Sequence, residues 1–249
     1  MHPSFPFENP AISAVLARLH ASAAADKWKI IPRMPRYFWA KFTGGLAHNS
    51  IQHRLFSDLY SAVTPERGAV LYLIARAIRA RRVVEFGSSF GISTLYLAAA
   101  VRDNFPGESA PAAQVVGSDM EARKVAAARK NVQAAELADL VTILQGDALQ
   151  TLQSVAGPLD LAFLDGRKDL YLPVLKLLEP KLRPGAVILS DNIDSFCKQV
   201  APFLRYVQSA TNGYTSATLG LSDGMEFSIY QQNEQKMPSS FYENRRTCP

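Results

Sequence analysis

Short apolar runs alternate with helical segments through the middle of this chain of 249 residues, and that alternation limits its possible folds. Five runs are mostly apolar, and each is followed by a small or polar residue: 83–86, 114–118, 140–144, 159–164 and 186–190. Strands that are apolar on both faces are typical of parallel sheets covered by helices on both sides. The pattern therefore predicts a doubly wound α/β domain.

The segments between and around these runs complete the expected fold. Thr64 and Pro65 are an N-cap and a first helical residue, and they begin a helix that continues to Ile74. Three more helices are expected at 93–101, 121–135 and 170–182. Two further strands, 216–219 and 225–230, flank the turn Ser222-Asp223-Gly224 and form a hairpin. We expect a mostly parallel, seven-stranded sheet that ends in an antiparallel hairpin.

The length suits one large domain better than two small ones. We divide it into an N-terminal helical extension at 1–60, a core at 61–231 and a polar tail at 232–249. The extension, which Pro32 and Pro35 interrupt, is expected to be a cap or lid.

Composition excludes several classes of protein. No apolar run reaches the roughly 18 residues that span a bilayer, and the N-terminus lacks the pattern of a signal peptide. Cys197 and Cys248 are the only cysteines, so a disulfide framework is not expected and a cytoplasmic location fits. The net charge is +5, but basic and aromatic residues do not interleave as they do at nucleic-acid surfaces. We therefore expect no membrane and no nucleic acid as partner.

The loop at 85–91, Glu-Phe-Gly-Ser-Ser-Phe-Gly, joins the first strand to a helix. Small residues here let the backbone approach a ligand closely. Glu85 stands where a dinucleotide-binding loop has its first glycine, and a carboxylate there would repel a pyrophosphate. The Glu85 carboxylate would suit a cationic ligand, such as one that carries an amino group and a sulfonium. If that ligand also carries a carboxylate, Ser93 could donate a hydrogen bond to it.

Acidic residues follow the next two strands. Asp119 is placed to accept hydrogen bonds from ribose hydroxyls, and Asp147 to meet an adenine amino group. Each aspartate taken alone is better explained as a helix N-cap. Together with Glu85, at three successive strand ends, they favour a ligand site.

Asp165 ends the fourth apolar run, and Asp191-Asn192 ends the fifth. Adjacent strands would bring these three oxygen ligands together, as Mg²⁺ prefers. The alternative is that Asp165 contacts only the cofactor and that Asp191-Asn192 caps the next segment. Lys168 is a candidate base if a neighbouring cation lowers its pKa, and otherwise a surface lysine.

The sequence from about residue 63 to residue 230 resembles a known protein family. The stretch 163–173, Phe-Leu-Asp-Gly-Arg-Lys-Asp-Leu-Tyr-Leu-Pro, and the later Asp191-Asn192 are similar to the cation-dependent O-methyltransferases. That family contains catechol O-methyltransferase and the plant caffeoyl-CoA enzymes. The resemblance implies a Rossmann-like methyltransferase fold, S-adenosylmethionine as methyl donor and Mg²⁺ or another divalent cation. It also implies a small, vicinal dihydroxy aromatic acceptor, and a monomer or homodimer.

The resemblance assigns roles to individual residues. Lys168 would be the general base, and Asp165, Asp191 and Asn192 the metal ligands. The cofactor contacts would be Val63, Glu85, Gly87, Ser88, Ser89, Gly91, Ser93, Asp119, Met120, Asp147, Ala148 and Asp165.

The acceptor side departs from the catechol enzymes. Arg167 replaces a tryptophan, Phe196 lies nearest to a proline gate, and 216–219 lacks an expected glutamate. Arg167 could select an anionic acceptor or simply face solvent. Three other functions remain open: a metal-independent O- or N-methyltransferase, a nicotinamide-dependent oxidoreductase, and a non-catalytic S-adenosylmethionine-binding protein.

Overall fold

The computed structural model describes residues 7, 9–30, 63–221 and 223–231, and the side chains of 26–30 and of Ala210 are not described. Most of the expected N-terminal cap or lid, the polar tail and Cys248 therefore lie outside the described residues. Among the helices of the described part, none is both long and apolar enough to cross a membrane.

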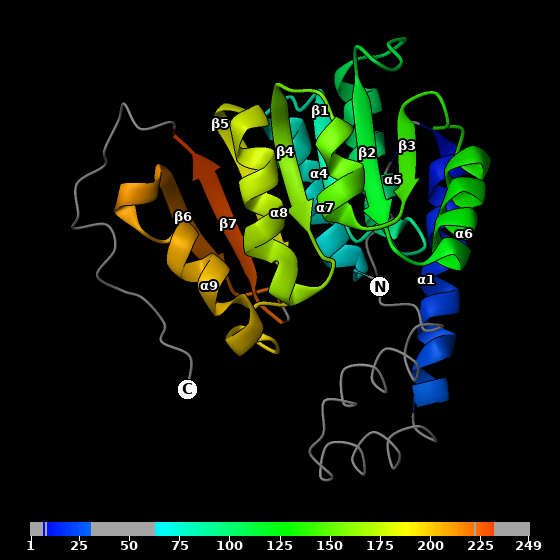
Figure 1. Cartoon of the computed structure of the whole chain (residues 1–249). Coiled ribbons are helices and arrows are strands. Elements are labelled where there is room, and N and C mark those ends of the chain that lie inside the picture. The colour runs from blue at the N-terminus through cyan, green and yellow to red at the C-terminus, as the bar shows by residue number, and fades with distance from the viewer. Residues whose placement is uncertain (1–6, 8, 31–62, 222, 232–249) are drawn as a thin grey trace.

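A seven-stranded sheet forms the centre of the molecule, in the order β3-β2-β1-β4-β5-β7-β6 (Figure 1). The strands are β1 Arg82–Phe86, β2 Gln114–Asp119, β3 Val141–Gln145, β4 Leu159–Leu164, β5 Leu182–Asp191, β6 Tyr214–Leu219 and β7 Met225–Tyr230. Strands β1 to β5 are parallel, and β7 runs antiparallel between β5 and β6. The predicted mostly parallel sheet with a terminal hairpin is confirmed.

Helices cover both faces of this sheet (Figure 1). The longer ones are α1 Pro10–Ile30, α4 Pro65–Ala77, α5 Ile92–Asn104, α6 Ala122–Ala134, α8 Tyr171–Leu178 and α9 Cys197–Val207, and α7 Ala148–Thr151 is a single turn. Two separate apolar clusters result. One joins α1, α4, α5 and α6 to the sheet, and the other joins α7, α8 and α9 to it. Burial on both faces explains why the strands are nearly continuous in apolar residues.

The N-terminal extension contributes α1, which packs on α5 and α6. Ile12, Leu16 and Leu19 are buried in the first apolar cluster, and their spacing places them on one side of the helix. The expected N-terminal helical extension is thus present in the fold.

The helices α8 and α9 and the start of β5 differ from the sequence-based expectation. The helix expected at 170–182 ends at Leu178, and a 3₁₀ turn, Glu179–Lys181, leads into β5 at Leu182. Pro180 lacks the backbone N–H that a continuing helix needs, and Leu182 pairs with Leu159 of β4 instead. Helix α9 was not expected, because Pro202 lies inside it and masks its helical pattern.

Candidate active site

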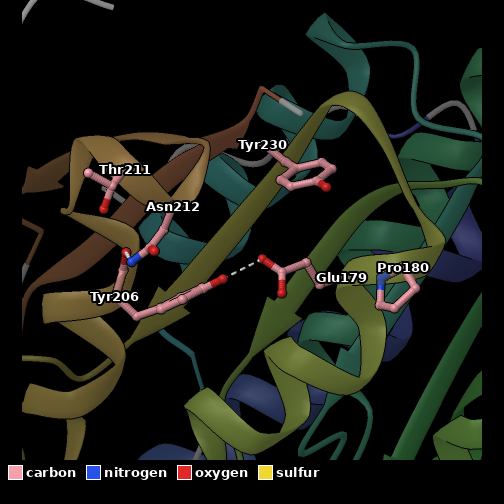
Figure 2. Close-up of a pocket in the computed structure, with 6 residues that line it drawn as sticks. All are labelled: Glu179, Pro180, Tyr206, Thr211, Asn212 and Tyr230. Atoms are coloured by element: carbon pink, nitrogen blue, oxygen red, sulfur yellow. Dashed lines mark hydrogen bonds between the residues drawn. The ribbon is translucent and has the colours of Figure 1, made fainter. Parts of the chain in front are cut away.

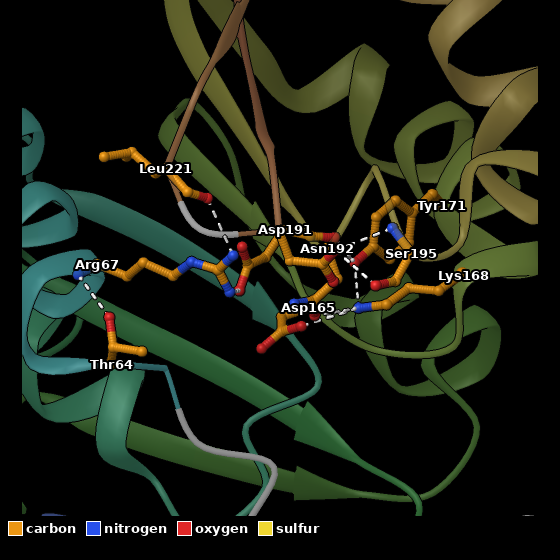
Figure 3. Close-up of polar contacts among 10 residues, drawn as sticks. Thr64, Arg67, Asp165, Lys168, Tyr171, Asp191, Asn192, Ser195 and Leu221 are labelled. Carbon is orange, nitrogen blue, oxygen red and sulfur yellow. Dashed lines mark hydrogen bonds and ion pairs between the residues drawn. The ribbon is translucent and has the colours of Figure 1, made fainter. Parts of the chain in front are cut away.

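The polar residues singled out in the sequence gather at one edge of the sheet, where β1 to β5 have their carboxyl ends. Asp165 and Asn192 directly follow β4 and β5, and Asp191 is the last residue of β5. Figure 3 shows the side chains of Asp165 and Asn192 turned toward Lys168, whereas that of Asp191 is turned toward Arg67. Open α/β sheets bind their ligands at this edge, so the strand-end positions make it the candidate active site.

Glu85 lies on β1 and is completely buried. The Thr94 hydroxyl of α5 donates a hydrogen bond to Oε2, whereas Oε1 has no partner within the described residues. Burial raises the pKa of the Glu85 carboxyl, and the charge of Asp165 adds to the rise, while the hydroxyls of Ser93 and Thr94 oppose it. A cation at this carboxyl would relieve an unfavourable buried charge.

The loop between β1 and α5, residues 87–91, lies close to the backbone that follows β4. Gly87 has φ +99°, and a Cβ there would stand 2.5 Å from the backbone nitrogen of Gly166. The amides of Gly87 and Ser88 both donate to the Ser118 carbonyl, at 2.9 and 3.2 Å. Only a residue without a side chain fits at Gly87, as the small-residue pattern of the β1–α5 loop predicted.

Asp119 and Asp147 are both engaged with backbone amides. Asp119 accepts hydrogen bonds from the amides of Ser89 at 2.8 Å and Glu121 at 2.9 Å. Asp147 accepts a hydrogen bond from the Leu149 amide at 2.9 Å and is the N-cap of α7. This is the helix-cap role that the sequence analysis gave as the alternative to a ligand contact. Each carboxylate can accept further bonds. The other expected cofactor residues differ in exposure: Met120 is exposed, and Val63, Ser93 and Ala148 are buried.

Lys168 connects the ends of β4 and β5. Its Nζ donates to Asp165 Oδ1 at 2.9 Å, to Asn192 Oδ1 at 3.1 Å and to Tyr171 Oη at 2.7 Å. The Tyr171 hydroxyl in turn donates to the Asp191 carbonyl at 2.9 Å. The Lys168 side chain is only 11% exposed, so it is not a surface lysine.

Asp191 has a partner that the sequence did not reveal. Arg67 of α4 donates from Nη1 to Asp191 Oδ2 at 2.9 Å and from Nη2 to the Leu221 carbonyl at 3.1 Å (Figure 3). Burial and the nearby charge of Asp165 raise the pKa of Asp191 to about 7, against the opposing effect of Arg67. No local pattern could identify this pair, because the two residues are 124 positions apart.

The donor set at this edge fits cationic ligands. Oxygens of Asp165 and Asn192 already surround one ammonium, and Asp191 Oδ1 is buried without a partner within the described residues. Asn192 has φ +58°, a strained conformation that recurs at functional sites. These oxygens are of the kind that Mg²⁺ binds. Within the described residues no group of three His, Cys, Asp or Glu could hold a metal, so a site here needs the asparagine.

On the acceptor side, Phe196 lies near Lys168, with its ring centroid 5.7 Å from Nζ. Asp223 Oδ1 accepts hydrogen bonds from the Ser195 amide at 2.9 Å and from its hydroxyl at 2.5 Å. The segment that carries Phe196 is thereby joined to the β6–β7 turn. Arg167 is 67% exposed and pairs with Asp169, which favours its solvent-facing interpretation.

A cavity of about 340 Å³ lies elsewhere, beside the start of β5 and the end of β7 (Figure 2). Its carboxylate, Glu179, accepts hydrogen bonds from the hydroxyls of Tyr206 at 2.7 Å and Tyr214 at 3.0 Å. Lys176 contacts Glu179 at 3.1 Å. Because its carboxylate already has these partners, and because the cavity is remote from the carboxyl ends of the parallel strands, it is not the candidate active site.

Comparison with known proteins finds similarity to methyltransferases. Residues 84–193 match the family model described as a methyltransferase domain. The catechol O-methyltransferase of Mycobacterium tuberculosis is 38% identical over 133 residues, which are 53% of this chain and 57% of that protein. The chain thus spans little more than half the length of this curated relative.

Two solved structures are similar over more of the chain. The cofactor-bound structure of Rv0187 from MTB is 27% identical with a TM-score of 0.63, covering 81% of this chain and 91% of that one. The O-methyltransferase TomG from Streptomyces achromogenes, solved in complex with SAM, is 25% identical with a TM-score of 0.61. That match covers 72% of this chain and 86% of TomG.

Proposed function

We propose that the chain is a class I O-methyltransferase, which transfers a methyl group from S-adenosylmethionine to a hydroxyl of a small acceptor. Its similarity to a methyltransferase domain and to known O-methyltransferases supports this. The acceptor we propose is a vicinal dihydroxy aromatic compound of the catechol type. A divalent cation, with Mg²⁺ as the first choice, would assist. The observation that carries the proposal is the convergence of Asp165, Lys168 and Asn192 on one point at the ligand-binding edge.

The charges at this edge support a cationic methyl donor. Glu85, Asp165 and Asp191 bring three acidic groups, and only Arg67 and Lys168 oppose them within this cluster. S-adenosylmethionine would supply the sulfonium methyl that is transferred. At Gly87 the β1–α5 loop packs tightly on the Gly166 backbone, and the buried carboxyl of Glu85 lies just before the start of this loop.

Asp165, Asp191 and Asn192 would hold the divalent cation. Such a cation, when bound, would lower the pKa of the acceptor hydroxyl. Arg67 keeps Oδ2 of Asp191 in place and leaves Oδ1 free to act as a ligand.

Lys168 is the proposed base. In methyl transfer a bond forms between the acceptor oxygen and the methyl carbon while the bond from that carbon to sulfur breaks, and the acceptor loses a proton. Lys168 Nζ would take this proton. It must first be neutral. A neutral amine has two N–H donors, so Lys168 has to give up at least one of its three acceptors, Asp165, Asn192 and Tyr171. Phe196 would bound the acceptor beside Lys168.

The test is product formation. The protein is incubated with methyl-labelled S-adenosylmethionine and a panel of catechols, monophenols and aromatic amines, and products are identified by mass spectrometry. We expect label on one oxygen of the catechols. Label on nitrogen alone, or equal labelling of monophenols, would contradict the proposed acceptor.

A further inference from the structure

One side of α6 packs against the end of the β1–α5 loop, at Phe90 and Gly91. Asn131 Nδ2 donates to the Phe90 carbonyl at 2.9 Å, and a Cβ on Gly91 would stand 3.3 Å from the Ala128 Cβ. Lys124 Nζ lies 5.9 Å from the centroid of the Phe90 ring. Residues three and four apart share one side of a helix, so these contacts form one continuous support.

Asn131 is held in a single orientation by α1. Arg18 Nη2 donates to Asn131 Oδ1 at 2.8 Å, while the amide nitrogen of the same side chain serves Phe90. Asn131 is 6% exposed, so water has little access to replace either contact. A flipped amide would face Arg18 with its NH₂ group and Phe90 with its oxygen, and both contacts would be lost.

Arg18 comes from a helix that is itself well anchored. Ile12, Leu16 and Leu19 bury the inner side of α1, and His20 Nε2 lies 3.1 Å from the Tyr96 hydroxyl of α5. The guanidinium of Arg18 is therefore presented to Asn131 from a fixed element, although the residue itself is exposed.

We propose that Asn131 is a positioning residue for the cofactor, and that α1 contributes to cofactor affinity through Arg18. The inference rests on the proposed function, since it takes the β1–α5 loop to bind the methyl donor. Ser89 has φ +47°, a strained conformation for a residue with a side chain, so the loop needs support from outside. Removing the Asn131 donor takes this hydrogen bond away from the loop and weakens that support.

The variant Asn131→Asp tests this most directly. It keeps an oxygen acceptor for Arg18 but replaces the donor to Phe90 with a second acceptor. We expect S-adenosylhomocysteine to bind about 10-fold more weakly by calorimetry, the effect of one lost buried hydrogen bond. Backbone amides of residues 87–91 should also exchange hydrogen faster in the ligand-free variant.

Asn104→Asp is the matched control. Asn104 is 8% exposed on α5, and its amide donates to the carbonyls of Ala75 and Ala80 at 3.0 and 3.1 Å. The substitution removes a buried amide donor of the same kind, at a place distant from the β1–α5 loop. It should therefore lower stability without changing cofactor affinity or the hydrogen-exchange rates of residues 87–91.

Arg18→Ala leaves Asn131 in place and should weaken binding by about 3-fold, since a hydrogen bond to a charged group is modest when exposed. If Asn131→Asp does not fold, Arg18→Ala can replace it in the comparison of cofactor affinity and hydrogen exchange with the unaltered chain. Equal affinity and equal exchange in the Asn131, Arg18 and Asn104 variants would overturn the inference. If the unaltered chain binds no S-adenosylhomocysteine, the proposed function fails, and hydrogen exchange alone still decides whether Asn131 positions the loop.

Discussion

Arg67 Nη1 donates to Asp191 Oδ2 at 2.9 Å, and the two side chains are only 6% and 2% exposed. The pair joins the start of α4 to the end of β5, and the second nitrogen of the guanidinium reaches the Leu221 carbonyl near the β6–β7 turn. Three segments that border the candidate active site are thereby held by one side chain.

Replacing Arg67 with methionine should destabilise the protein strongly. The change leaves a buried carboxylate without its counter-charge, which costs about 3–5 kcal/mol. Urea unfolding measures the loss. The double variant with Asp191→Asn should recover part of it, because the unpaired charge is then gone. If the two single losses simply add, the residues do not interact as described.

Lys168→Ala should lower turnover by about 10²-fold or more while leaving affinity for S-adenosylhomocysteine nearly unchanged. The side chain touches the proposed acceptor site rather than the β1–α5 loop. Steady-state kinetics and calorimetry make the comparison. Arg167→Ala is the neighbouring control, since Arg167 is exposed and pairs only with Asp169 among the described residues. Equal turnover in the Lys168 variant and the unaltered chain would remove the base assignment.

Divalent cations should stabilise the protein more at pH 8 than at pH 6. The pKa of Asp191 is raised from 3.8 to about 7, so the stability that this group contributes at low pH is lost as the pH rises through about 7. A cation binds the charged form and restores stability where that form predominates. Melting temperatures with Mg²⁺ and with chelator, at both pH values, test this. The pH difference should vanish in Asp191→Asn, and a cation effect that is the same at both pH values would contradict the assignment.

Gly87→Ala should cost more stability than Gly107→Ala, and it alone should weaken cofactor binding. Both glycines have positive φ, +99° and +80°, so both substitutions carry a backbone strain of about 1–2 kcal/mol. A Cβ on Gly107 meets nothing within 4 Å, whereas one on Gly87 overlaps Gly166 and should add about 1–3 kcal/mol. Thermal unfolding and S-adenosylhomocysteine titration separate the two effects, and equal losses would argue against a close approach at Gly87.

Local patterns in the sequence were enough to predict most of the fold. The strand predicted at 159–164 has the bounds of β4, and Thr64 caps α4 as expected. The same patterns misjudged β5, because Pro184 and Gly185 near its start are typical of turns. They also missed α9, whose Pro202 is tolerated inside the helix. These errors fall where tertiary pairing overrides local preference.

The candidate site was predictable only in part. Acids at strand ends could be placed at one edge because parallel strands share it, and Asp165, Lys168 and Asn192 do meet there. Arg67 could not be found in this way, because its contact with Asp191, 124 positions along the chain, depends on the tertiary fold and not on local spacing. The sequence left two roles open for Asp147, helix cap and ligand contact, and the structure shows the cap.

The central claim is cation-dependent methyl transfer, and the most direct measurement follows transfer from S-adenosylmethionine to catechols with Mg²⁺, after excess chelator, and after Mg²⁺ is restored. The account predicts transfer that disappears with chelator and returns with the cation, and little transfer at any stage in Asp165→Asn. Transfer that is indifferent to chelator would contradict the cation site, and no transfer to any acceptor, with the cofactor bound, would contradict the enzyme itself.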